Sequence, residues 1–261
     1  MTLQIGNPHL LAQKTNIDVV HDFRRRDISL GGQGAPLVPI FHKLLVRDQK
    51  LPVSVVNIGG VANITYVDED RLIAFDTGAG GALIDDAMIE YFGKPFDNEG
   101  ELAASGNVDI LIVKKIMSME YFNAPYPKSL DRNAFIFLKD MLLTHSPVDM
   151  IATLTYITSV SIAGALLSLP KIPKNLFLCG GGRKNTQMIM WIKEILVKEN
   201  KNCKIEDISI INNHDPDYIE SQAFAYLSAR FFCNLPSAFT TTTNTSKDNI
   251  CGCLVQNGNR K

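Results

Sequence analysis

The stretch Leu72-Ile-Ala-Phe-Asp76-Thr77-Gly78-Ala79-Gly80-Gly81-Ala82-Leu83-Ile84-Asp85 decides the fold class of this 261-residue chain. Its first four residues are an apolar, partly β-branched run that predicts a buried strand. Asp-Thr and three glycines within four residues come next, and then an apolar run that predicts a helix. A strand, a glycine turn and a helix in this order present backbone N–H groups and a positive helix end to an anion. The stretch therefore predicts a phosphate-binding turn; the alternative is a glycine-rich turn without a ligand.

The glycine spacing differs from the two commonest nucleotide motifs. It is not G-x-x-x-x-G-K-[ST], which excludes a Walker-type loop, and it is not the G-x-G-x-x-G of a dinucleotide site. A second junction of the same kind lies at residues 175–198, where an apolar strand runs into Gly180-Gly181-Gly182 and then into a helix with the only tryptophan, Trp191. Two such junctions in one chain favour a ligand site over plain turns.

Composition narrows the class of protein. Apolar residues make up 46% of the chain and charged residues 20%, which is typical of a soluble globular protein. The net charge of −1 offers no basic field for a nucleic acid or an anionic membrane, so neither is expected as a partner. We find no apolar run of membrane-spanning length and no signal peptide pattern at the N-terminus. We therefore expect a cytoplasmic protein.

The five cysteines do not form a metal-binding pattern. Three of them lie in apolar or amphipathic runs, where a reduced core thiol is the usual role. Cys251-Gly-Cys253 has a single intervening residue, which is not the spacing of a zinc ribbon. We expect no metal bound by protein side chains alone.

The hydrophobic pattern predicts an α/β fold. Short turns join three predicted strands at residues 51–58, 61–67 and 72–75, which makes an antiparallel meander. Further strands are predicted at 17–21, 175–179 and 204–210. Helices are predicted at residues 8–14, 40–46, 82–92, 108–119, 134–143, 150–169, 186–198 and 215–232. Loops are expected at 29–39, 121–129 and 237–249. The expected architecture is a mixed sheet flanked by helices.

A charged run follows the first predicted strand. Asp22-Phe-Arg24-Arg-Arg-Asp27 places three arginines between two aspartates, directly after residues 17–21. Charge clusters of this kind are usually solvated surface. At the carboxyl end of a strand, however, α/β proteins also place their ligands. Both interpretations stay open on the residues alone.

Several blocks of the chain, in one order, resemble the anhydro-N-acetylmuramic acid kinase family. The resemblance covers residues 4–254. The blocks that carry it are Val20-His-Asp22-Phe-Arg24-Arg-Arg-Asp27-Ile-Ser-Leu-Gly-Gly-Gln-Gly34-Ala-Pro, Val56-Asn57-Ile-Gly59-Gly60-Val-Ala-Asn63, Asp76-Thr77-Gly78, Tyr121-Phe with Pro127-Lys128-Ser129, Cys179-Gly-Gly-Gly-Arg183, and Glu220 with Ala223-Phe-Ala225.

This resemblance implies an actin/hexokinase-like (ribonuclease H-like) fold, in which two lobes close on ATP. Residues 1–48 would be a remnant of the N-terminal lobe that carries the sugar-site motif, and residues 49–261 the C-terminal nucleotide-binding lobe. It implies an ATP- and Mg²⁺-dependent enzyme of peptidoglycan recycling. Such an enzyme opens 1,6-anhydro-N-acetylmuramic acid with water and phosphorylates O6, giving N-acetylmuramic acid 6-phosphate.

Site roles follow from the resemblance. Asp22 is the expected general base, because a carboxylate near the anomeric carbon can take a proton from the attacking water. Arg24 and its neighbours would hold Asp22 ionised or bind the lactyl carboxylate, and Glu220 would face the sugar. Nucleotide phosphates and adenosine would lie against two segments: Asp76, Thr77 and Gly78 in the first, and Gly180, Gly181 and Gly182 in the second.

Two departures from the family pattern affect these expectations. Ala79, Gly80 and Gly81 stand where the family shows Pro and Gly-Asn after Asp-Thr-Gly. The first phosphate loop, Gly-Thr-Ser-Leu-Asp-Gly, does not occur in this sequence. We therefore expect a kinase chain that acts with a separate N-terminal half-chain, and a homodimer as a further association. The alternatives are an inactive remnant or sugar-binding module, another sugar kinase or ATPase of the superfamily, and a plain interaction domain.

Overall fold

A five-stranded mixed sheet forms the centre of the protein in a computed structural model, which describes residues 2–211 and 215–258. The strand order is β4-β3-β2-β5-β6. The strands are β2 (Val53–Ile58), β3 (Val61–Val67), β4 (Leu72–Ala79), β5 (Asn175–Cys179) and β6 (Lys204–Asp207). β2, β3 and β4 pair antiparallel, whereas β2, β5 and β6 pair parallel. The predicted meander, the strand beside it and the α/β class with a mixed sheet are confirmed.

Helices surround the sheet much as the pattern predicts. Among the described residues they are α1 (Pro8–Thr15), α2 (Arg25–Ser29), α3 (Pro39–Leu45), α4 (Ala82–Phe92), α5 (Glu101–Ser105), α6 (Ile110–Met117), α7 (Glu120–Asn123), α8 (Phe137–Leu142), α9 (Pro147–Leu167), α10 (Thr186–Lys198), α11 (Ile219–Phe232) and α12 (Thr240–Thr243). The bounds of α4 and α10 match the predicted ones. The short helix α12 lies within the predicted loop 237–249, and the short helix α7 overlaps the start of the predicted loop 121–129. The predicted strand 204–210 ends at Asp207, because its carboxylate accepts the N–H of Ser209 and starts a 3-10 turn.

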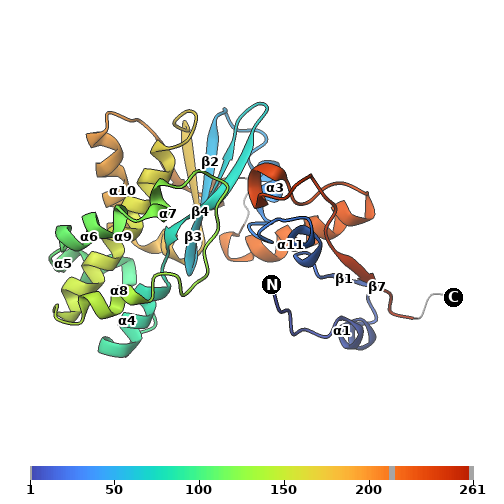
Figure 1. Cartoon of the computed structure of the whole chain (residues 1–261), viewed down its shortest axis with the longest axis horizontal. Coiled ribbons are helices and arrows are strands. Elements are labelled where there is room, and N and C mark those ends of the chain that lie inside the picture. Colours follow the sequence, from blue (N-terminus) through green and yellow to red (C-terminus); the bar gives the residue numbers. More distant parts are fainter. Residues whose placement is uncertain (1, 212–214, 259–261) are drawn as a thin grey trace.

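The two faces of the sheet pack against different helices (Figure 1). Side chains alternate along a strand, so Val56 and Ile58 of β2 join the large core with α4, α9 and α10. Val53 and Val55 point to the opposite face and pack with α3 and the start of α11. The result is a three-layer arrangement in which both faces of the sheet are covered, as the parallel strands require.

Helix α9 is the longest element of the core. It has 21 residues, and an 18-residue window within it has a mean hydropathy of 1.7, which is enough to cross a membrane by length and composition. The expectation that no apolar run reaches that length is therefore corrected. In the structure 78% of this apolar window is buried against the sheet and neighbouring helices, which is the environment of a core helix.

A smaller sheet joins the two ends of the chain. β1 (Val19–His21) pairs antiparallel with β7 (Cys253–Val255). Phe23, Leu37, Leu227, Ala238 and Cys251 form a separate small core beneath this pair. The C-terminal segment thus packs on the first forty residues of the chain. The division of the chain at residue 48 stays a prediction.

Strand β4 continues beyond its predicted end. The register between β3 and β4 shifts at Ala62 and Asn63, so that Thr77 is the extra residue of a β-bulge. Asp76 and Gly78 therefore belong to the strand, not to the turn after it. The sequence pattern missed this extension, because consecutive polar and glycine residues usually end a strand.

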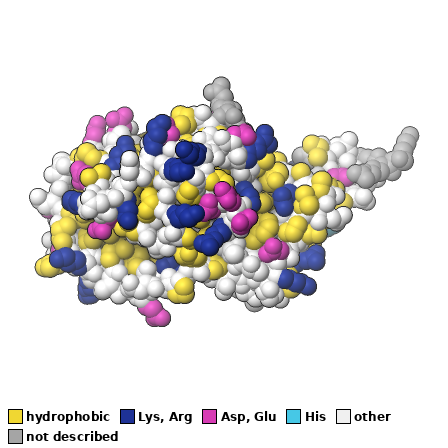
Figure 2. All heavy atoms as spheres, turned by 90° about the horizontal axis from the view of Figure 1, so that it is seen from above, with side chains coloured by type: hydrophobic (Ala, Val, Ile, Leu, Met, Phe, Trp, Pro, Cys, Tyr) yellow, Lys and Arg dark blue, Asp and Glu magenta, His cyan; other side chains and the backbone are white. Residues whose placement is uncertain are grey.

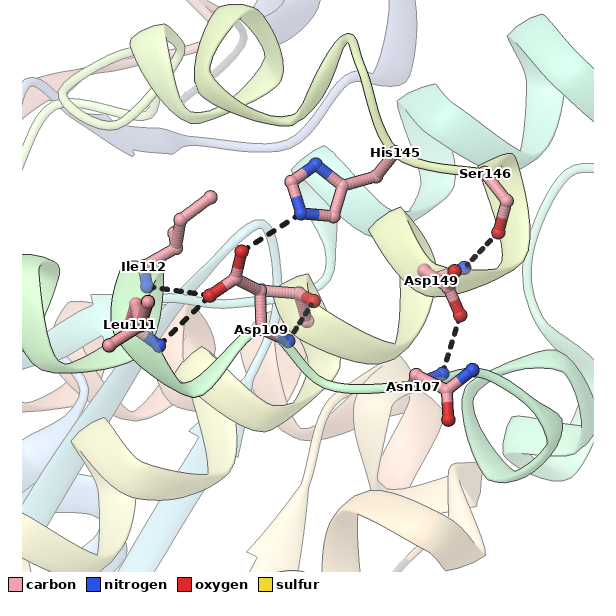
Figure 3. Close-up of polar contacts among 8 residues, drawn as sticks. Asn107, Asp109, Leu111, Ile112, His145, Ser146 and Asp149 are labelled. Carbon is pink, nitrogen blue, oxygen red and sulfur yellow. Dashed lines mark hydrogen bonds and ion pairs between the residues drawn. The ribbon is translucent and has the colours of Figure 1, made fainter.

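A polar seam fastens α6 and the preceding loop to the region before α9 (Figure 3). Asp109 caps α6 by accepting the N–H groups of Leu111 and Ile112, and its Oδ2 lies 2.9 Å from Nε2 of His145. The Ile112 and His145 hydrogen bonds hold the pKa of the Asp109 carboxyl below its usual value. This seam lies apart from the residues that line the cavities described next.

Candidate active site

A cavity of 340 Å³, cavity A, opens at one end of the sheet. Asn57, Asn63, Asp76 and Cys179 line it from four adjacent strands, all from the face that packs on α3 and α11. Asn57 is the penultimate residue of β2, and Cys179 is the last residue of β5, which runs parallel to β2. Ligands of α/β proteins bind at this edge, beyond the carboxyl ends of parallel strands.

Asp76 is held firmly at the wall of cavity A. Its Oδ2 accepts the N–H of Leu130 at 2.7 Å, and its own N–H donates to the carbonyl of Lys128. Tyr121 donates its hydroxyl to the Asp76 carbonyl. Burial raises the pKa of Asp76 to about 6, although the Leu130 N–H lowers it. The loop containing Pro127-Lys128-Ser129 therefore shapes the surroundings of this carboxyl.

Thr77 and Gly78 lie differently from Asp76. The hydroxyl of buried Thr77 donates to the carbonyl of Ala62. A Cβ at Gly78 would come within 2.8 Å of Oγ of Ser161 on α9. Neither Thr77 nor Gly78 is among the described residues that line cavity A. Their positions are accounted for by the bulge and by close packing on α9, and a phosphate-binding role for them stays a prediction.

The second glycine turn separates cavity A from a larger one. Gly180 and Gly181 line cavity A, whereas Gly181 and Gly182 line cavity C, which has a volume of 600 Å³. Gly180 has a φ of +78°, and a Cβ there would collide with Asn57 and the carbonyl of Ile58. Only glycine suits that position.

Arg183 fixes this turn in place. Its buried guanidinium donates to the Gly180 carbonyl and pairs with Asp207 and Asp217, at 3.0 to 3.1 Å. Asp217 also lines cavity A. Arg183 ends one of the blocks that carry the family resemblance, but it was not among the predicted site residues, because its role depends on Asp207 and Asp217.

Cavity C lies between the two glycine-rich segments. Gly59, Gly60 and Gly81 line one side, and the 181–182 turn with Lys184 lines the other. Asp85 on the first turn of α4 also faces it. Burial first, and then the neighbouring Asp86, raises the pKa of Asp85 to about 6. Backbone glycines, one lysine and a helix start are groups that can hold a phosphorylated ligand.

Asp22 lies at the end of β1, on a third cavity. Cavity B, of 620 Å³, is lined by Asp22, Arg24 and Arg25 together with N-terminal residues. Asp22 has a φ of +58°, and its Oδ2 pairs with Nε of Arg25 at 2.8 Å. Its other oxygen, Oδ1, is buried without a hydrogen-bond partner. A strained backbone and an unpaired carboxylate oxygen are features of functional sites.

Arg24 is positioned by a chain of hydrogen bonds. Its Nη1 donates to the Gly34 carbonyl at 2.6 Å, and the Gly34 N–H donates to Oδ2 of Asp27 at 2.8 Å. Asp27 is fully buried, and its Oδ1 accepts the hydroxyl of Thr243. The C-terminal segment thus helps to orient an arginine that lines both cavity A and cavity B.

Glu220 lies on the first turn of α11 and lines cavity A. The structure therefore brings Arg24, Asp76, Glu220 and the 180–181 turn to one cavity, and places Asp22 on the adjoining cavity B.

His42 also lines cavity A. Its Nδ1 lies 2.8 Å from the Thr65 hydroxyl, and burial lowers the pKa of this histidine to about 4. His42 was not predicted as a site residue, because no sequence pattern distinguishes a single histidine within an apolar helix.

The face shown in Figure 2 carries Lys and Arg side chains interspersed with Asp and Glu, as the near-zero net charge implies. An α/β sheet with glycine turns beside carboxyl-lined cavities is the arrangement expected of a phosphotransferase.

Comparisons with known proteins agree with this class of enzyme. The model of the family "Anhydro-N-acetylmuramic acid kinase" matches residues 1–257. The chain belongs to this family.

Curated relatives carry the same family name. The kinase of Rhodopseudomonas palustris strain BisB18 is 44% identical, over 93% of this chain and 66% of its own length. That of Shewanella sp. strain MR-4 is 39% identical, over 96% and 68%. This chain spans about two thirds of the length of these relatives. A solved structure, the activator of 2-hydroxyisocaproyl-CoA dehydratase from Clostridium difficile, has a TM-score of 0.42 at 12% identity, over 72% of this chain and 67% of that chain.

Proposed function

We propose that this chain is the sugar- and nucleotide-binding part of an ATP-dependent kinase that opens 1,6-anhydro-N-acetylmuramic acid and phosphorylates its O6. The product would be N-acetylmuramic acid 6-phosphate, an intermediate of peptidoglycan recycling in the cytoplasm. The observation that carries this proposal is the buried, unpaired Oδ1 of Asp22 beside an arginine-lined cavity. The reaction itself is inferred from the chain's membership of the anhydro-N-acetylmuramic acid kinase family.

Asp22 has the properties of a general base. Its Oδ1 is free to accept a hydrogen bond from water, while its Oδ2 is held by the ion pair with Arg25. The base takes one proton from water as the oxygen attacks the anomeric carbon, and the bond from that carbon to O6 breaks. O6 then attacks the γ-phosphorus of ATP, and ADP leaves.

The remaining roles concern binding. A sugar that reaches Asp22 in cavity B and the polar wall of cavity A would have Arg24 beside it, because that arginine lines both. A guanidinium can bind the lactyl carboxylate with two hydrogen bonds. Glu220 lines cavity A and is available to a sugar hydroxyl.

The nucleotide would occupy cavity C, with its phosphates directed past Gly181 towards cavity A. Gly180, Gly181 and Gly182 allow the backbone to approach it closely. Among the described residues, no three His, Cys, Asp or Glu side chains lie together as a metal site. Mg²⁺ bound mainly by ATP phosphates needs few protein ligands. The Asp76 carboxyl on the wall of cavity A is the protein ligand that we propose for it. When bound, Mg²⁺ would neutralise the charge that develops on the phosphates.

Complete turnover would need a second phosphate-binding element. Phosphoryl transfer depends on holding the γ-phosphate from both sides. We propose that the third of the relatives' length not matched by this chain supplies that element, and that a separate half-chain can provide it. A homodimer is a further proposal.

The experiment compares binding and turnover in one variant pair. Asp22→Asn should keep sugar binding within about threefold, because the amide has nearly the same shape, while turnover falls by about 10³-fold or more. Asp48→Asn, at an exposed carboxyl paired only with Arg47, is the control and should change neither. Sugar binding is measured by calorimetry. Turnover is measured by mass spectrometry of the 6-phosphate, with a polypeptide that matches the unmatched third of a curated relative supplied to every variant. Turnover that survives in Asp22→Asn would exclude this residue as the base.

A further inference from the structure

One aromatic side chain lies at the junction of cavities A and B. Among the described residues, only Arg24 and Phe224 line both. Asp22 lines B but not A, whereas Asp76 and Glu220 line A but not B. A ligand that contacts Asp22 and the polar wall of cavity A must therefore pass over Phe224 and Arg24.

The ring of Phe224 is held in a defined orientation. It packs edge-to-face on Phe23, with ring centroids 5.6 Å apart, and is half-buried. Phe224 follows Glu220 by four residues on α11, so the two side chains lie on the same face of the helix. An apolar surface thus lies one helical turn from a carboxylate, and the Arg24 guanidinium lines the same two cavities as the ring.

This combination suits a sugar. A pyranose presents C–H groups on one face and hydroxyl groups around its rim, and an aromatic ring offers a flat apolar surface to such a face. Glu220 and Arg24, the polar residues beside Phe224, can then bind the hydroxyl groups around the rim of the sugar. We propose that Phe224 is the platform on which the anhydro-sugar ring stacks. This contact determines specificity for the sugar and not for the nucleotide. This inference rests on the proposed function.

The same helix provides a matched control. Tyr226 lies two residues further along α11, is also half-buried, and also packs on another ring, that of Phe41 at 5.7 Å. It lines neither cavity A nor cavity B. Phe224→Leu and Tyr226→Leu each remove one aromatic ring from α11 and from one ring pair.

The first measurement is the affinity for 1,6-anhydro-N-acetylmuramic acid by calorimetry. Phe224→Leu should weaken it by about tenfold or more, and Tyr226→Leu by less than about twofold. Binding of a non-hydrolysable ATP analogue should stay within about twofold in both. Phe224→Tyr, which keeps the aromatic face, should bind the sugar nearly as well as the unchanged chain.

The second measurement places a reporter at the junction. Trp191 is the only tryptophan, so Trp191→Phe gives a background without tryptophan emission. In that background, Phe224→Trp should change its emission when the sugar is added, whereas Tyr226→Trp should not. This pair decides the matter if Phe224→Leu does not fold.

The outcomes separate the two proposals. If the unchanged chain binds no sugar, the proposed function fails and this inference fails with it. If it binds sugar but Phe224→Leu and Tyr226→Leu weaken binding equally, or not at all, only the platform is excluded. An emission change on sugar addition in the Tyr226→Trp protein but not in the Phe224→Trp protein also excludes it. Loss of nucleotide affinity in Phe224→Leu alone would assign the ring to the nucleotide instead.

Discussion

Asp22 and Asp76 are the same residue type in two different environments. Asp22 pairs with an arginine and keeps one oxygen without a partner. Asp76 is buried at the sheet end, and an N–H of the backbone is its principal polar contact. The sequence singled out both positions, but not this difference, because it depends on Arg25 and on Leu130, which lies 54 residues away from Asp76.

The Asp76 environment predicts a pH-dependent cost to stability. The folded pKa of about 6 lies above the usual 3.8, so burial penalises the charged form. The penalty is absent below about pH 4 and complete above about pH 6. Asp76→Asn removes it, and should raise the free energy of unfolding by about 3 kcal/mol at pH 7.5 and by little at pH 4. Urea unfolding at both pH values measures this. Asp70→Asn, in an exposed turn, is the control and should change the free energy of unfolding by less than about 0.5 kcal/mol. An equal gain from Asp76→Asn at both pH values would contradict the account.

At the scale of elements, sequence reasoning succeeded where the periodicity is local. The bounds of α4, α10 and β5 follow from apolar spacing and from the residues that end each run. The bulge at Thr77 could not be predicted, since it depends on the register with β3. The glycines at positions 78, 80 and 81 had suggested a close approach to phosphate, yet Gly78 is required by packing on α9.

Two identical substitutions should therefore have opposite effects. A Cβ at Gly78 would lie 2.8 Å from Oγ of Ser161 and 3.2 Å from the ring of Phe122. Gly78→Ala should destabilise the fold by about 2 to 3 kcal/mol through overpacking. Gly164, on the exposed side of α9, has nothing within 4 Å of such a Cβ. Gly164→Ala should stabilise by about 0.5 to 1 kcal/mol through helix propensity. Thermal unfolding of both variants is the measurement, and a stable Gly78→Ala protein would contradict the packing argument.

For the whole molecule, the site depends on contacts between distant parts of the chain. Asp27 and Thr243, which are 216 positions apart, join the arginine motif to the C-terminal segment. The resemblance to a known family singled out the Asp22 to Asp27 motif, whereas the polar Thr-rich tail was expected to be a loop. Its role in the site emerges only once β7 pairs with β1.

Breaking this link should loosen the site without unfolding the large core. Asp27→Ala leaves the Gly34 N–H and the Thr243 hydroxyl without their buried acceptor, at a cost of about 2 to 4 kcal/mol. Hydrogen exchange at Gly34 and across residues 19–34 should become faster, while β2 and α9 stay protected. Uniform loss of protection over the whole chain would show instead that Asp27 supports the global fold.

The central claim is that this chain holds the base that opens an anhydro-sugar while O6 is phosphorylated. The most direct test supplies the chain with ATP, Mg²⁺, the sugar, ¹⁸O-labelled water and a polypeptide matching the unmatched third of a curated relative. Mass spectrometry of the product is the measurement. We predict N-acetylmuramic acid 6-phosphate with ¹⁸O at the anomeric carbon, formed about 10³-fold or more slowly by Asp22→Asn. Label-free product, or equal product from the variant, would contradict the claim.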